Sequence, residues 1–122
     1  MRRALISALA LSFALGANAA AAEGITATQK RALQVWAETG ALAKHCPRAR
    51  VNHEGLGAML LIAGIDPAAL TAGGPIGAAA FRAAYEADEA GRKLAGNSAA
   101  CAAAKILYGP DGTSGPGMMD MD

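Results

Sequence analysis

The strongest constraint on this chain comes from two cysteines, Cys46 and Cys101, which are the only cysteines in its 122 residues. If their side chains join, the bond closes a loop of about 56 residues, and the loop entropy removed from the unfolded chain is worth about 4 kcal/mol. A small domain is stable by only about 5 to 15 kcal/mol in total. A disulfide would therefore supply a large share of the stability, and the compartment in which the chain folds decides whether it forms.

The first 22 residues have the order of features of a secretory signal peptide. A basic start is followed by an apolar run over residues 4–15 and by the small-residue site Ala17-Asn18-Ala19. The apolar run has about a dozen residues, whereas a membrane span needs about twenty. We therefore predict that residues 1–22 are a signal peptide cleaved after Ala19 or Ala22, that the protein is periplasmic or secreted, and that it has no membrane span.

Export favours a structural disulfide between the two cysteines, because such bonds persist in oxidising compartments. The alternatives are a reactive thiol and a thiolate metal ligand. Once Arg2 and Arg3 leave with the signal peptide, nine basic and ten acidic residues remain. A chain so close to neutral has no electrostatic reason to bind nucleic acid, and residues 23–110 have the length of one small domain.

Helical signals recur through residues 23–110 and predict several helical segments. The expected segments are residues 26–45, 53–63, 67–71, 75–94 and 99–108. Thr26 or Thr28, Asn52 and Asp66 are suitable N-cap residues for three of them. Because no alternating strand pattern occurs, the sequence predicts an all-α fold, a small four- to five-helix bundle with one disulfide.

The expected core is thin, because 24 of the residues from Glu23 onward are alanines and alanine adds helix propensity but little burial. Its larger members are expected to be Trp36, Leu42, Leu56, Met59, Leu60, Ile62, Phe81, Tyr85 and Leu107. The segment 53–63 has the widest apolar arc, so we expect it at the centre of the bundle. If part of that arc is open instead, it is the expected partner-binding surface, formed by Leu56, Met59, Leu61 and Ile62.

The C-terminal residues 111–122 are rich in Gly, Pro, Ser and Asp, and this composition predicts a disordered tail. The tail also carries Met118, Met119 and Met121. Thioethers are soft ligands suited to Cu(I), so the tail is one candidate copper site.

Few other residues offer chemistry. His45 and His53 flank Cys46 and could take part in a copper or zinc site if that thiol were reduced. Two histidines without a closed ligand set are commonplace, so our first expectation is that the protein has no cofactor. Ser98 and Ser114 have no histidine or acid at a spacing typical of nucleophilic catalysis, and we expect that the protein is not an enzyme.

The sequence therefore predicts a small exported helical protein with a non-catalytic binding or structural role in the periplasm. The first alternative is a periplasmic copper-binding protein that uses the histidines or the Met/Asp tail. The second is a chaperone or inhibitor that docks an unidentified protein partner on an apolar helix face. Neither the identity of such a partner nor the oligomeric state is specified by the sequence.

Overall fold

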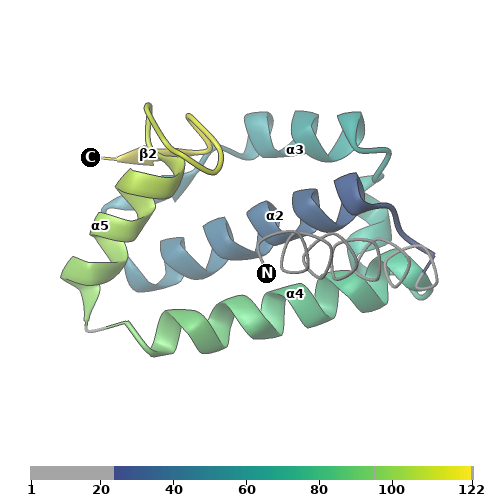
Figure 1. The fold of residues 1–122 in the computed structure, drawn as a ribbon, viewed down its shortest axis with the longest axis horizontal. Helices are drawn as coiled ribbons and strands as arrows, with labels where there is room; N and C mark the ends of the chain where they lie inside the picture. The colour runs from purple at the N-terminus through teal and green to yellow at the C-terminus, as the bar shows by residue number, and fades with distance from the viewer. Residues whose placement is uncertain (1–23, 95, 122) are drawn as a thin grey trace, which may run out of the picture.

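Four α-helices, one 3-10 helix and two short strands form the described part of this computed structural model, residues 24–94 and 96–121 (Figure 1). In chain order they are α2 (Ala27–His45), β1 (Ala49–Val51), α3 (His53–Ile62), η1 (Pro67–Thr71), α4 (Pro75–Arg92), α5 (Asn97–Tyr108) and β2 (Met119–Met121). The prediction of a mostly helical chain is confirmed, although a small sheet accompanies the helices. The predicted signal peptide lies outside the described residues. No helix in the described ranges is long and apolar enough to cross a membrane.

α2, α3 and η1 begin where their predicted capping residues indicated, whereas α5 begins at Asn97, two residues before the predicted start. Thr26 and Gln29 form a capping box, with the backbone N–H of each donating to the side chain of the other at 3.0 Å. Asn52 caps α3 by accepting a hydrogen bond from the Gly55 N–H at 3.1 Å. α3 ends at Ile62, and Gly64 follows two residues later with a φ of +80° that suits glycine. These boundaries follow from interactions between residues close in sequence.

The central helix is α2, not α3 as the apolar arc of residues 53–63 predicted. α2 packs most extensively on α4 and also contacts α5, α3 and β1. Figure 1 shows α2 between α3 and α4, with α5 and the two-stranded sheet at one end. Because α3 contacts only α2 and η1 to a substantial extent, one stripe of α3 is covered and the remainder faces solvent.

This arrangement corrects three members of the predicted core. Ile62 at the end of α3 is 87% exposed, and Phe81 and Tyr85 on α4 are 76% and 62% exposed. On α4 the buried positions are small residues, Gly77, Ala80 and Gly91. The close packing of α4 on α2 therefore uses the small-residue stripe of α4 and leaves its aromatic stripe outside.

The α2–α4 seam depends on a glycine near its end. A Cβ atom at Gly91 would lie 2.8 Å from Cδ2 of His45 and 3.9 Å from Cβ of Ala41, so a larger residue there would require the His45 ring or α4 to shift. A glycine inside a helix normally lowers the stability of that helix. In the structure α4 continues through Gly91 to Arg92, and the glycine allows the close approach of the two helices.

The predicted disulfide is confirmed. Cys46 and Cys101 are bonded with their Cα atoms 5.0 Å apart, and the bond joins the end of α2 to α5. Cys46 is fully buried in a core cluster that includes Val35, Leu42 and Leu56. Neither cysteine is free, so the reactive-thiol and thiolate-ligand alternatives do not apply to this oxidised state.

The prediction of a disordered tail is wrong for residues 111–121. β2 pairs antiparallel with β1, placing Met119 opposite Val51 and Met121 opposite Ala49. Met119 is only 1% exposed, because it lies in the same core cluster as the disulfide. Composition is an average over the whole segment, and this average predicted disorder. One deeply buried side chain and a strand partner are nevertheless enough to hold the segment in place.

Candidate functional site

The predicted metal ligands occupy structural positions. Met119 is buried, and Met118 and Met121 pack partly buried against the same core cluster. His53 is exposed at the start of α3, and His45 is half-buried at the end of α2. Within residues 24–94 and 96–121, no group of three or more His, Cys, Asp or Glu side chains could hold a metal ion. The copper hypothesis therefore stays a prediction, and packing accounts for the methionines.

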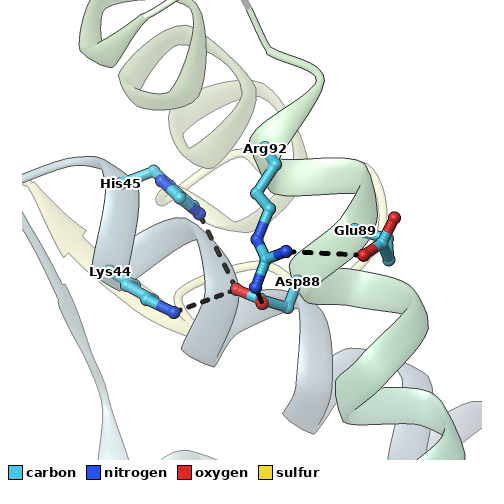
Figure 2. A network of polar contacts seen from close by, with 5 residues as sticks. All are labelled: Lys44, His45, Asp88, Glu89 and Arg92. Atoms are coloured by element: carbon cyan, nitrogen blue, oxygen red, sulfur yellow. Dashed lines mark hydrogen bonds and ion pairs between the residues drawn. The ribbon is translucent and has the colours of Figure 1, made fainter.

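A network of charged side chains ties the end of α2 to α4 (Figure 2). Asp88 is its centre, with one carboxylate oxygen 3.1 Å from Lys44 Nζ and the other 2.9 Å from an Arg92 guanidinium nitrogen. The hydrogen bond from Lys44 is the main cause that lowers the pKa of Asp88 below its usual 3.8. Arg92 also lies 3.6 Å from a Glu89 oxygen. The exposed cations make this network a helix clamp of modest strength.

His45 is the incomplete member of this network. Its Nε2 atom is buried without a hydrogen-bond partner and lies 3.9 Å from the Asp88 carboxylate, beyond hydrogen-bond distance. The ring lies close against Gly91 of α4. One imidazole and one carboxylate already paired with two cations do not form a metal site, so the packing role of His45 is the better supported.

A second polar contact joins the end of α5 to the middle of α2. The Tyr108 hydroxyl donates a hydrogen bond to Oε2 of Glu38. Burial is the main cause that raises the pKa of Tyr108 above its usual 10.0, and the Glu38 carboxylate raises it further. The two residues are 70 positions apart in the chain, and no spacing in the sequence indicated the pair.

The small side chains along the α2–α4 seam leave hollows beside it. We call the first the Trp36 groove, which consists of adjoining cavities of about 540 and 240 Å³ that share Trp36 and Ala84. The larger cavity runs to η1 and Phe81, and the smaller runs to the Lys44–Asp88 ion pair. Its larger apolar side chains are Trp36, Leu70 and Phe81. The groove is thus open, elongated and apolar, with charge at one end.

The second hollow, which we call the Glu38 pocket, is bounded by α2, α4 and α5 and has a volume of about 330 Å³. The residues that line it are Gln34, Glu38, Ala41, Leu42, Ala83, Glu86, Ala87, Ala90, Gly91, Leu94, Ala103 and Leu107. The pocket and the Trp36 groove share Ala41 on α2. On α4 they share no residue, because each is lined by a different side of that helix. The two hollows therefore flank the same helix seam on different sides.

Of the four predicted partner-binding residues, only two are open to a partner. Leu56 is buried and Met59 is half-buried, whereas Leu61 and Ile62 are exposed at the end of α3. Phe81, which the sequence placed in the core, lines the Trp36 groove instead. A residue's place on the apolar side of a helix does not reveal whether a neighbour covers it, so the sequence could not locate this surface.

The chain matches no protein-family model, no curated protein and no solved structure with which it was compared. The function is therefore argued from the geometry of the molecule itself.

Proposed function

We propose that this protein is a non-catalytic binding protein of the periplasm that receives an apolar segment of a partner protein in the Trp36 groove. The observation that carries the proposal is the position of Phe81, which lines the groove while 76% of its surface remains exposed. Large aromatic side chains next to a concave apolar surface are typical anchors of protein interfaces.

The shape of the groove supports an extended or helical segment as the occupant. Leu70 on η1 and Phe81 on α4 flank the wider cavity, and half-buried Trp36 on α2 joins it to the narrower one. An amphipathic helix binds by laying one apolar face into such a groove. This proposal takes up the docking-face hypothesis and places that face beside the α2–α4 seam instead of on α3.

The polar residues of the groove support a binding role without catalysis. Its ionisable lining residues are Lys44 and Asp88, which pair with each other at 3.1 Å. A carboxylate neutralised in this way is a poor general base, since the pKa of Asp88 is lowered. The periplasmic address rests on the signal-peptide pattern and on the disulfide, which is typical of exported proteins.

Site-specific photo-crosslinking in the native compartment tests this proposal. A photoreactive phenylalanine analogue placed at Phe81 should form a covalent adduct with a partner protein. The matched control is Ile106 on α5, which is 62% exposed but lies outside the groove, and it should form no such adduct. Equal adduct yields at the two positions, or none at Phe81, would contradict the proposal.

A further inference from the structure

The Glu38 pocket shares Ala41 with the proposed docking groove but lies on the other side of the α2–α4 seam. Its apolar walls come from α2, α4 and α5, with Leu42, Leu94 and Leu107 as the largest side chains and alanines between them. A volume of about 330 Å³ is at the lower end of the range of small-molecule sites. Since a water molecule takes up roughly 30 Å³ of liquid, the pocket has room for roughly ten non-hydrogen atoms.

The charged groups that line the pocket have one sign. Glu38 and Glu86 are the ionisable residues in its lining, and Gln34 adds a neutral polar group. Lys30 and Arg82 line an adjoining cavity that shares Glu86 with the pocket, and Arg31 lines another that shares Glu38, whereas the lining of the pocket itself includes no Lys or Arg.

One of these carboxylates is held in place from outside. The Tyr108 hydroxyl donates a hydrogen bond to Oε2 of Glu38. Tyr108 is 1% exposed, which makes it a rigid support. A carboxylate oriented in advance loses less entropy when it binds a cation than a freely rotating surface glutamate does.

We infer that the Glu38 pocket binds a small amphipathic organic ammonium ion. Its apolar body would lie against the alanine and leucine walls, and its ammonium group would donate hydrogen bonds to Glu38 and Glu86. A fatty anion of the same length would place its charge next to two carboxylates. A neutral alcohol would fill the apolar volume without the charge-assisted hydrogen bonds.

Isothermal titration calorimetry of the purified protein with n-octylamine, octan-1-ol and octanoate tests this inference. Octylamine, which is protonated at neutral pH, should bind saturably to one site, with octan-1-ol and octanoate at least roughly tenfold weaker. Equal affinities for the three compounds, or no saturable binding of the amine, would overturn the inference.

Three variants locate the site. Ala90→Leu fills the pocket from an exposed position on α4 and should abolish octylamine binding, and Glu86→Gln should weaken it roughly tenfold or more. The control Glu54→Gln changes an exposed acid in the first turn of α3, outside the pocket, and should leave binding unchanged. Circular dichroism checks that each variant is folded. Octylamine affinity that is the same in all three variants would place the binding elsewhere and refute the inference.

This site is independent of the proposed partner groove. Ala90→Leu should leave photo-crosslinking at Phe81 unchanged, because Ala90 does not line the Trp36 groove. Loss of crosslinking with retained octylamine binding would count against the partner groove alone. Loss of octylamine binding specificity with retained crosslinking would count against the ammonium pocket alone.

Discussion

Replacement of Met119 by alanine is the sharpest test of how the C-terminal segment contributes to the fold. Met119 is 1% exposed, and its cluster includes Val35, Leu42, Leu56 and Tyr108. Truncating a buried methionine to alanine costs about 2 to 5 kcal/mol, because transfer free energy is lost and a cavity remains. Since Met119 is enclosed by both helical and strand neighbours that cannot all relax inward, we expect about 3 kcal/mol.

This loss is measurable against the total stability of a small domain, which is about 5 to 15 kcal/mol. Urea unfolding followed by far-UV circular dichroism should show a lower midpoint with an unchanged slope, since the surface exposed on unfolding hardly changes. In a domain of this size each 1 kcal/mol shifts the Tm by about 4 to 8 °C, so we expect a fall of roughly 10 to 25 °C.

The control is Asp120→Ala, one residue along the same strand. Asp120 is exposed and pairs across the ladder with Arg50. An exposed substitution of this kind changes stability by about 0.5 kcal/mol or less. If Met119→Ala proved as mild as Asp120→Ala, the C-terminal strand would contribute nothing to the core, and the packing argument would be refuted.

Three further predictions concern the covalent and polar links between helices. Replacing both Cys46 and Cys101 by alanine should lower the free energy of unfolding by about 4 kcal/mol in urea, and an unchanged midpoint would contradict the entropic argument. The raised pKa of Tyr108 means that the folded protein holds the phenol proton more tightly than the unfolded chain does. Stability should therefore be full below pH 10.0 and fall as the pH rises above it. Tyr108→Phe should reduce this fall, and parallel stability curves would contradict the raised pKa of Tyr108. Because the pKa of Asp88 is lowered, its stabilisation is present at neutral pH and is lost as the pH falls below 3.8. The Tm difference between Asp88→Asn and the parent protein should be small at neutral pH and vanish in acid, and a difference that persisted in acid would point to packing instead.

Local signals determined where the first helices of this protein begin and end. The capping box at Thr26, the N-cap at Asn52 and the stop at Gly64 act between residues at most five positions apart, so they can be read from the sequence. The cysteine pair is the exception to this short range. Its disulfide was predictable because the signal-peptide pattern predicts export to an oxidising compartment and a count of two leaves a single intramolecular partner for each cysteine.

Tertiary structure alone decided which apolar faces are covered. α3 has the wider apolar arc, yet α2 became central because the small residues of α4 allow α4 to pack closely against it. The same close packing put Phe81 outside and created the hollows on either side of the seam. The order of the C-terminal segment, the Tyr108–Glu38 contact and both candidate sites each join residues far apart in the chain. Helical periodicity shows which side of a helix is apolar. Whether that side is buried depends on which neighbouring helix packs against it, and this is decided only when all the helices pack together.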